Sequence, residues 1–130
     1  MAELGVADRV HLTGPIYDRE KFKAIVDAAC LCLPSRQEGF SIAITETLAC
    51  GCPVVISEGC HFPEVAEVGA GKVTPLRATE VAEALGEVLI DPKEATAMGS
   101  RGRKLVCERF TWPKVAQAIM TAYRAATEPV

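Results

Sequence analysis

This chain of 130 residues has few aromatic residues and no clustered stripe of basic residues. Only 5% of the residues are aromatic, and the formal net charge is -3. A protein that binds nucleic acid needs positive charge to neutralise phosphates and usually aromatic rings to stack on bases. A module that lies on an anionic membrane surface needs clustered lysine and arginine. The composition therefore excludes both classes.

Long apolar runs and targeting signals are also absent from the sequence. No apolar stretch approaches the ~18 residues of a membrane-spanning helix, and the N-terminal residues Met1–Gly5 have no signal-peptide pattern. Internal repeats and low-complexity tracts are missing as well. With 49% apolar and 24% charged residues, the composition is that of one soluble globular domain spanning residues 1–130. We expect the chain to be cytoplasmic.

The six cysteines form no recognisable zinc or disulfide pattern. The two Cys-x-Cys pairs, Cys30/Cys32 and Cys50/Cys52, are closer in sequence than the Cys-x₂₋₄-Cys spacing of zinc sites. Residues 30–33 instead have the composition of a buried strand, and a domain of this size needs no disulfides. The cysteines are therefore interpreted as small buried residues, with a metal or redox site as the alternative.

Strand-like and helix-like segments alternate along the chain. Short apolar runs predict strands at 10–13, 31–33, 54–56 and 72–74. Apolar periodicity and capping residues predict helices at 19–29, 41–49, 63–68 and 81–89. Two further helices are predicted, one that follows an N-cap at Asp91 and ends at about 108, and one that begins at 111. This alternation predicts an α/β fold: a Rossmann-like three-layer domain with a parallel sheet of about four strands flanked by helices. Ligands bind at the carboxyl ends of such strands, so the candidate loops are 14–18, 34–40, 57–63 and 74–79.

One of these loops has the features of an anion-binding site. It leaves the strand at 31–33, passes Gly39 and enters the helix at 41–49, for which Ser41 is the expected N-cap. A helix N-terminus presents unpaired N–H groups and a partial positive charge, so that it can hold a phosphate. Gly39 removes a side chain where a ligand would approach the backbone.

Two glutamates in this region are candidate functional residues. Glu46 has apolar or small neighbours three and four positions away on the helix, so its carboxylate lies on a face otherwise suited to burial. Such a carboxylate can accept both hydroxyls of a ribose. The alternative for Glu46 is a cap on a backbone N–H or an ion pair with a lysine. From composition alone, Glu38 and Arg36 are solvated loop residues, with a phosphate contact as the alternative for Arg36.

A series of motifs spans nearly the whole chain. It consists of Pro34-Ser35, Glu38-Gly39-Phe40, Glu46 after seven intervening residues, Ala49-Cys50-Gly51-Cys52-Pro53-Val54-Val55, Gly59–Val65 and Phe110-Thr111-Trp112. The series resembles the signature of glycosyltransferase family 4, also called group 1. A lone pair of glutamates at this spacing is a weak signal, but the order of the motifs is specific. The resemblance implies the donor-binding domain of a retaining, two-domain enzyme of the GT-B type.

The resemblance also implies a role for each matched residue. Glu38 would be the catalytic residue and would contact the donor sugar, either as a nucleophile or as the electrostatic partner of an oxocarbenium-like transition state. Glu46 would bind the ribose. The sugar or diphosphate would contact the backbone of Gly39, Phe40, Ser41 and Ile42, and the base would lie near Gly14, Pro15 and Ile16. The substrate would be a nucleotide diphosphate sugar that donates a hexose without a cofactor or metal ion, in agreement with the lack of an Asp-x-Asp motif.

Two places depart from the family pattern. Ser41 stands where the family often has glycine, which changes the sugar contacts without removing the backbone donors. Cys60 and His61 replace a glycine and its neighbour. We interpret His61 as a loop residue, with a general acid or a ligand-binding residue as the alternative.

The resemblance further implies parts that lie outside this chain. The family neutralises the diphosphate with an Arg and a Lys near a strand that would precede Met1, and it binds the acceptor with an N-terminal domain. We therefore expect a donor half that is inactive alone, that is membrane-associated only through the missing half, and that self-associates through an open sheet edge or its last helix. The alternatives are another GT-B enzyme such as a sugar-phosphate synthase, a non-catalytic Rossmann-like module that binds a nucleotide or a protein, and a flavodoxin-like domain. The donor sugar, the base and the acceptor stay open.

Overall fold

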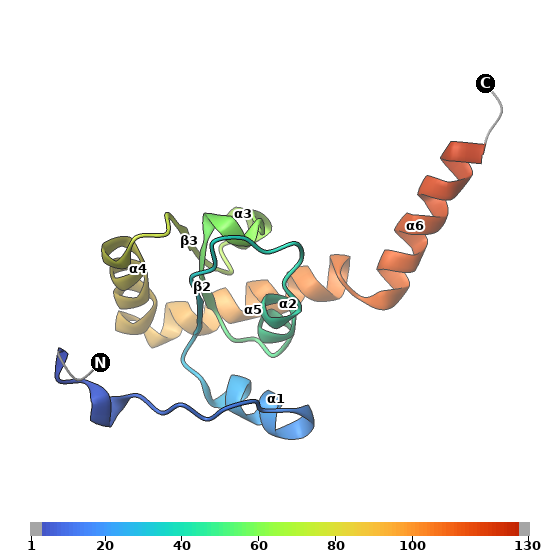
Figure 1. Cartoon of the computed structure of the whole chain (residues 1–130). Coiled ribbons are helices and arrows are strands. Elements are labelled where there is room, and N and C mark those ends of the chain that lie inside the picture. The colour runs from blue at the N-terminus through green and yellow to red at the C-terminus, as the bar shows by residue number, and fades with distance from the viewer. Residues whose placement is uncertain (1–3, 128–130) are drawn as a thin grey trace.

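Three short parallel strands form the centre of the protein, for which the computed structural model describes residues 4–127 (Figure 1). The strands are β1 (Leu31–Leu33), β2 (Val54–Ser57) and β3 (Gly71–Thr74), and they lie in the order β1-β2-β3. Leu31 is in register with Val54, and Val54 with Gly71. Each strand therefore pairs with the next one along the chain, as in one half of a doubly wound sheet.

Helices cover both faces of this sheet and extend beyond it. They are α1 (Asp18–Asp27), α2 (Ile42–Ala49), α3 (Glu64–Glu67), α4 (Ala78–Ile90), α5 (Pro92–Arg109) and α6 (Trp112–Thr127), with short 3₁₀ turns at Ala7–Arg9 and Glu58–Cys60. These bounds confirm the helices expected from the sequence, to within three residues at each predicted end. Within residues 4–127, no helix combines the length and apolar character needed to cross a membrane.

The middle strand divides the core into two clusters. Side chains alternate between the two faces of a strand, and on β2 Val54 and Ile56 belong to one cluster while Val55 belongs to the other. The first cluster joins β2 to α2, α3 and α5, and the second joins Val55 to α4 and the first half of α5. Helix α5 therefore contributes to both sides of the sheet. This arrangement in three layers confirms the predicted α/β fold class.

Capping residues set the starts of two helices, as the sequence predicts. The Ser41 hydroxyl accepts the N–H of Ile44 at 3.5 Å, a long contact, and caps α2. The Asp91 carboxylate accepts the N–H groups of Lys93 and Glu94 at 3.0 and 3.1 Å and caps α5. Each cap satisfies donors that a helix leaves unpaired at its first turn.

Helix α5 presents two glycines, Gly99 and Gly102, to the end of α2 and the turn that follows it. A methyl group on Gly99 would overlap the carbonyl group of Gly51, and a methyl group on Gly102 would lie 2.6 Å from Leu48 Cδ2. Both glycines are buried. The close approach of the two helices therefore depends on the missing side chains at these two positions.

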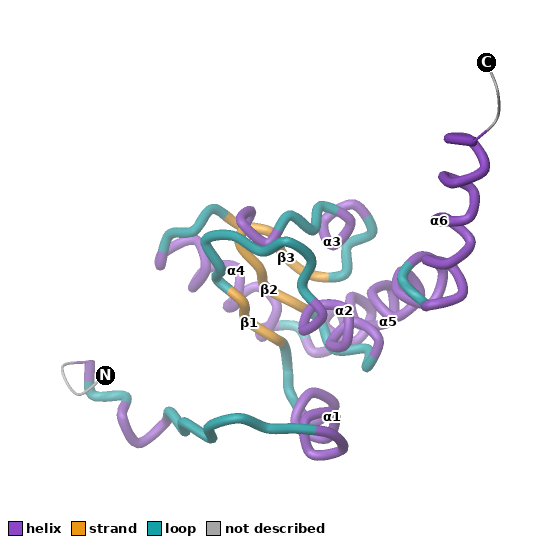
Figure 2. The backbone as a smooth tube through the Cα atoms, turned by 45° about the vertical axis from the view of Figure 1, so that its right-hand side comes forward, coloured by secondary structure: helices purple, strands orange, loops and turns teal. Residues whose placement is uncertain are grey.

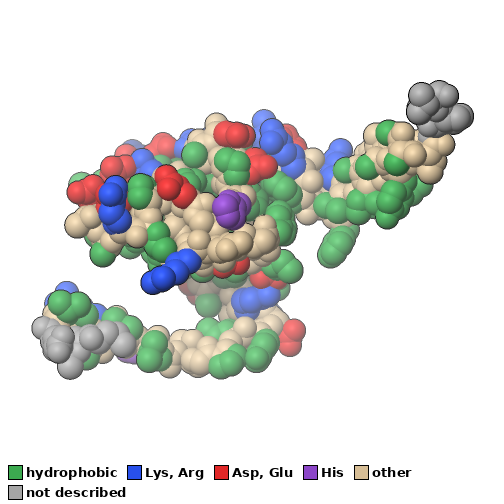
Figure 3. All heavy atoms as spheres, turned by 45° about the horizontal axis from the view of Figure 1, so that its top comes forward, with side chains coloured by type: hydrophobic (Ala, Val, Ile, Leu, Met, Phe, Trp, Pro, Cys, Tyr) green, Lys and Arg blue, Asp and Glu red, His purple; other side chains and the backbone are tan. Residues whose placement is uncertain are grey.

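The two ends of the described chain lie apart from the sheet. In Figures 1 and 2, α6 projects beyond the body of the molecule, and the segment before α1 runs beneath the sheet. Large apolar side chains of α6 are exposed, among them Trp112, Ile119 and Tyr123, which are 86%, 47% and 64% exposed. Figure 3 shows apolar side chains gathered along this projecting helix. Helix α6 therefore has an unpartnered apolar face.

The strand predicted at 10–13 is not formed, which corrects the predicted sheet. Val10 has extended backbone angles, with φ -117° and ψ 120°, but residues 10–17 belong to no helix or strand. A strand is stabilised by hydrogen bonds to a neighbouring strand, and residues 10–13 pair with none of the three strands described. The described part of the chain therefore has three strands where about four were predicted.

Candidate functional site

Two loops meet at the carboxyl ends of β1 and β2. The first, called here the Glu38 loop (residues 34–41), joins β1 to α2, and the second joins β2 to α3. The N–H of Glu38 donates to the carbonyl oxygen of Gly59 at 2.8 Å, and the Ser57 hydroxyl donates to the carbonyl oxygen of Ser35. The second loop therefore fixes the backbone of the first.

The Glu38 carboxylate is oriented by a residue of its own loop. The Ser35 hydroxyl donates to Glu38 Oε1 at 2.6 Å, and the Glu38 side chain is half-buried. Within residues 4–127, the other carboxylate oxygen, Oε2, accepts no hydrogen bond and forms no ion pair. One oxygen of the carboxylate is thus held by the protein, and the other is available to a ligand.

The backbone between Glu38 and α2 offers unpaired donors and open space. The N–H groups of residues 39–42 donate to no acceptor in the described part of the chain. No atom lies within 4 Å of the position that a Gly39 Cβ would take, so the packing of the protein itself does not require glycine there. Ile42, at the start of α2, is 66% exposed. Free N–H groups at the positive end of a helix suit an anionic ligand.

The Phe40 side chain of the Glu38 loop packs against two other aromatic rings, those of Phe62 and Phe110. The Phe40 ring centroid lies 5.8 Å from that of Phe62 and 5.7 Å from that of Phe110, and the latter two are 5.2 Å apart. These separations fall in the range of about 4.5–7 Å in which aromatic rings attract one another. Phe40 therefore anchors the loop to the start of α3 and the end of α5. The sequence does not reveal this cluster, because its members come from three distant segments.

Glu46 lies in the second turn of α2 and forms an ion pair with α1. The Lys21 ammonium group donates to Glu46 Oε1 at 2.7 Å, and the two side chains are 36% and 26% exposed. The sequence leaves a choice between a ribose contact and a lysine partner for Glu46, and the structure shows the lysine partner. Lys21 itself is not found by sequence reasoning, because it lies 25 positions away and carries no motif.

The residues predicted near the base are not brought to the Glu38 loop. Gly14, Pro15 and Ile16 lie in the irregular segment before α1, where Gly14 has φ +69° and its carbonyl accepts the Thr13 hydroxyl at 3.0 Å. In Figures 1 and 2 this segment runs beneath the sheet, while the Glu38 loop crosses above it. The structure therefore places Glu38, residues 39–42 and Glu46 on one loop and helix, and residues 14–16 in the segment before α1, the helix whose Lys21 pairs with Glu46.

His61 belongs to the loop that holds the Glu38 loop in place. Its φ of +49° is in the left-handed region, which favours glycine, although histidine tolerates it better than most residues do. Its neighbour Cys60 is buried, and the Cys60 thiol donates to the Leu33 carbonyl oxygen at 3.3 Å. The His61 side chain is exposed and forms no hydrogen bond or ion pair with residues 4–127. The geometry agrees with the interpretation of His61 as a loop residue.

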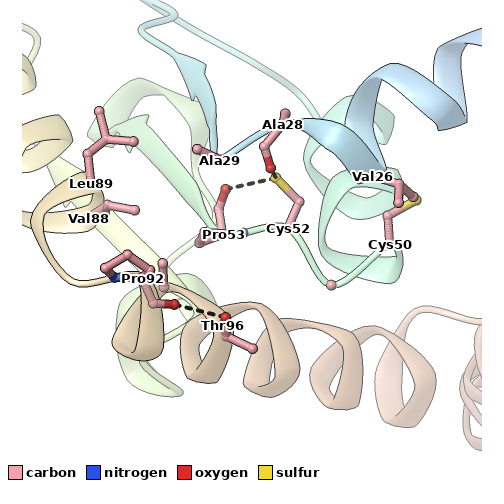
Figure 4. A pocket seen from close by; sticks show the side chains of 12 residues that line it. Val26, Ala28, Ala29, Cys50, Cys52, Pro53, Val88, Leu89, Pro92 and Thr96 are labelled. Carbon is pink, nitrogen blue, oxygen red and sulfur yellow. Dashed lines mark hydrogen bonds between the residues drawn. The ribbon is translucent and has the colours of Figure 1, made fainter.

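A cavity of about 340 Å³ lies at the opposite end of the sheet (Figure 4). Its lining includes Ala28 and Ala29, which precede β1, and Cys52 and Pro53, which precede β2. The Cys52 thiol contacts the carbonyl oxygens of Ala28 and Pro53, both at 3.6 Å. Small apolar side chains and thiols dominate the lining, and ligands of parallel sheets bind at the other end of the strands. The cavity is therefore not the candidate site.

Metal or redox chemistry by the cysteines is not favoured by their surroundings. Burial, together with the nearby Cys30 and Cys50 thiols, raises the pKa of Cys52 to about 11, and burial also raises the pKa of Cys30. Thiols with raised pKa values stay protonated at neutral pH and are poor nucleophiles and ligands. All six cysteines are free, and within residues 4–127 no three His, Cys, Asp or Glu side chains are grouped to hold a metal ion. Only Cys52 and Cys60 are buried and Cys107 is exposed, so the interpretation as buried residues holds for part of the set.

Comparison with known proteins connects this architecture to one family. The family model described as glycosyl transferases group 1 matches residues 1–105. The MMP alpha-(1->4)-mannosyltransferase of Mycolicibacterium hassiacum is 37% identical over 131 residues, which cover 97% of this chain and 31% of that protein. The D-inositol 3-phosphate glycosyltransferase of Saccharomonospora viridis is 32% identical over 126 residues, which cover 95% of this chain and 29% of that protein.

A solved structure gives the same result for the fold. The sucrose-phosphate synthase of Thermosynechococcus elongatus superposes with a TM-score of 0.81 at 33% sequence identity, covering 96% of this chain and 32% of that one. The chain thus spans about a third of the length of the proteins that it matches. The match includes the sheet, its flanking helices and both loops at the carboxyl ends of β1 and β2.

Proposed function

Since the chain belongs to the group 1 glycosyl transferases, we propose that it is the donor-binding domain of a retaining hexosyltransferase. The donor in this proposal is a nucleotide diphosphate sugar, and the hexose passes to an acceptor held by another domain. The relatives named above support a transferase: one is named a mannosyltransferase and another a glycosyltransferase. That the chain spans only about a third of their length supports a larger enzyme.

The Glu38 loop carries the proposal, because it combines three features in one strand-loop-helix unit. Free N–H groups of residues 39–42 at the start of α2 would hold the diphosphate. Open space at Gly39 would admit the donor to the backbone. Glu46 lies four residues after Ile42, so it is ~6 Å further along the helix axis, where the ribose of a nucleotide bound at the helix start would lie.

Glu38 would act on the sugar that is transferred. An oxocarbenium-like transition state carries positive charge, which a fixed carboxylate stabilises. The structure supports such a role because the N–H of Glu38 is bound to Gly59 and its Oε1 to the Ser35 hydroxyl, leaving Oε2 for the sugar. Two routes would retain the configuration of the sugar. In one, the Glu38 carboxylate displaces the nucleoside diphosphate to form a glycosyl ester, and the acceptor hydroxyl then displaces Glu38 from the opposite face. In the other, Glu38 only stabilises the oxocarbenium-like transition state, and the acceptor hydroxyl attacks from the face that the diphosphate leaves.

The chain alone would bind the donor weakly and would not transfer sugar. The leaving diphosphate develops negative charge, and positioned positive charge lowers the barrier to its departure. In this proposal the negative charge is stabilised by the N–H groups of α2 and by cationic side chains outside the chain, rather than by a metal ion.

The acceptor would bind to an N-terminal domain of the same cytoplasmic enzyme, and the exposed apolar face of α6 would mediate self-association of the isolated chain. A non-catalytic nucleotide- or protein-binding module is not favoured by the relatives named above.

Titration with nucleotides tests the proposal without requiring catalysis. UDP, GDP and ADP would be titrated into the full chain and followed by ligand-observed NMR. We expect saturable binding of one nucleotide, weakened about tenfold or more in Glu46→Ala, because the ribose loses its acceptor. Glu83→Ala is the matched control, since Glu83 is an exposed glutamate on the remote helix α4. Absence of binding at millimolar concentration, or equal affinity of both variants and the unaltered chain, would sink the proposal.

A further inference from the structure

The ion pair between Lys21 and Glu46 suggests a role for a residue that no motif contains. We propose that Lys21 is a positioning residue for the nucleotide ribose: it fixes the Glu46 carboxylate in the orientation that accepts the ribose hydroxyls. The inference rests on the proposed function, since it concerns the same site. It goes beyond that function, because Lys21 lies outside the matched signature and belongs to a different helix.

The position of Lys21 sets this ion pair apart from the other described ion pair on α1, Lys23–Glu20. Its ammonium group lies 2.7 Å from Glu46 Oε1, and both side chains are partly buried. Within residues 4–127, this is the only side-chain hydrogen bond that leads from α1 to another element. Lys23, two positions further on, pairs with Glu20 of the same helix, and these side chains are 54% and 69% exposed. Lys23 therefore provides a matched control that carries the same charge on the same helix.

Glu46 depends on Lys21 because its own helix cannot orient it. Its neighbours at three and four positions are Ile42, Ala43, Ala49 and Cys50, and none of them donates a hydrogen bond to the carboxylate. A carboxylate has about four lone-pair sites. Lys21 occupies one of those on Oε1, and Oε2 accepts no hydrogen bond within the described residues. Enough acceptor sites thus remain for two ribose hydroxyls, on a carboxylate that the ammonium group anchors at Oε1.

The same geometry allows an opposite behaviour, in which Lys21 competes with the ribose. The two cases predict opposite changes in nucleotide affinity when Lys21 is removed. If Lys21 positions Glu46, its removal weakens nucleotide binding and reduces the dependence on the ribose hydroxyls. If Lys21 competes, its removal strengthens binding. If the ion pair merely docks α1 against α2, its removal changes neither the affinity for the nucleotide nor the dependence on the ribose hydroxyls.

The test compares a ribonucleotide with its 2′-deoxy form in matched variants. The full chain would be titrated with UDP, GDP and ADP, and the nucleotide that binds would then be compared with its 2′-deoxy counterpart. In the unaltered chain we expect the ribonucleotide to bind about tenfold more tightly. In Lys21→Met the ratio should fall to about twofold or less, because the carboxylate is no longer held in place. Lys21→Arg should restore most of the ratio, and Lys23→Met should leave it unchanged.

Each contrary result has a distinct meaning. An unchanged ratio in Lys21→Met, or tighter binding by that variant, would overturn the inference while leaving the proposed function intact. Binding of no nucleotide by the unaltered chain would overturn the proposed function and the inference with it. Circular dichroism of each variant would show that it is folded. If Lys21→Met does not fold, Lys21→Leu, which also lacks a donor, is put through the same comparison, with the same expected loss of the ratio.

Discussion

Gly39 and Gly59 of the candidate site have different surroundings, and replacing each by alanine tests a different role of glycine. At Gly39 a Cβ would meet no atom within 4 Å. At Gly59 it would lie 2.6 Å from the carbonyl carbon of Arg36 and 2.7 Å from the carbonyl oxygen of Ser35, and closer still to the Arg36 oxygen. Neither glycine has the positive φ that would disfavour alanine by itself. Gly39→Ala therefore tests access of a ligand, and Gly59→Ala tests the packing of one loop on the other.

The expected magnitudes follow from these contacts. The atoms that a Gly59 methyl group would strike belong to the backbone of the Glu38 loop, which cannot move without displacing Ser35 and Glu38. Overpacking of this kind costs about 1–3 kcal/mol, so we expect Gly59→Ala to lower the free energy of unfolding by about 2 kcal/mol and to weaken donor binding. Gly39→Ala meets no obstacle and restricts the unfolded chain, which stabilises a protein by about 0.4–1 kcal/mol. Its nucleotide affinity should nevertheless fall by about tenfold, or ~1.4 kcal/mol, because the methyl group occupies the space assigned to the donor.

Two measurements on the same samples check this prediction. Urea denaturation followed by circular dichroism gives the free energy of unfolding, and ligand-observed NMR gives the nucleotide affinity. If Gly39→Ala loses as much stability as Gly59→Ala, the loop geometry described here is refuted. A stable Gly39→Ala variant that binds the nucleotide as tightly as the unaltered chain would refute the assignment of that space to the donor.

Three further predictions concern the rest of the molecule. Gly99→Ala should lower the free energy of unfolding by about 2 kcal/mol, since its methyl group would overlap a backbone carbonyl of the neighbouring loop. Gly86→Ala, in open space on α4, should raise it by about 1 kcal/mol, and thermal unfolding of the two variants compares them. The Cys52 thiol, with its pKa raised to about 11, should react with iodoacetamide far more slowly than the exposed Cys107 at about pH 8, and faster as the pH rises towards 11. Mass spectrometry of the peptides would follow both cysteines, and rapid alkylation of Cys52 at about pH 8 would contradict its raised pKa. The chain should form dimers at high concentration through α6, and Ile119→Asp should prevent this; sedimentation velocity that shows only monomers at every concentration would argue against it.

Features that depend on neighbours in sequence could be predicted from the sequence. The strand at 31–33 and the cap at Ser41 lie within a dozen residues, and the structure contains both in the predicted place. The same is true of the Asp91 cap of α5. A strand, in contrast, also needs a neighbouring strand, which can be distant in the sequence. Residues 10–13 have the composition and the extended backbone of a strand, but no neighbour among the described residues offers them hydrogen bonds.

Features that join distant segments could not be predicted in this way. The sequence shows that Glu46 needs a partner but does not identify Lys21, because the partner is set by the packing of α1 against α2. The ring cluster of Phe40, Phe62 and Phe110 likewise forms only when the Glu38 loop, α3 and the end of α5 come together. Gly39 and Gly59 both stand in loops, and only the surroundings distinguish the glycine with open space from the one in close contact.

The order of the strands also determines when the domain can fold during synthesis. Leu31 and Val54 are 23 positions apart in the sequence, and Val54 and Gly71 are 17 positions apart. The entropic cost of closing such segments rises only slowly with their length, so each strand can pair soon after it leaves the ribosome. The first core cluster, however, includes Leu105 and Val106 of α5. One face of the sheet therefore stays uncovered until these residues emerge, and the nascent chain needs protection from aggregation over that interval.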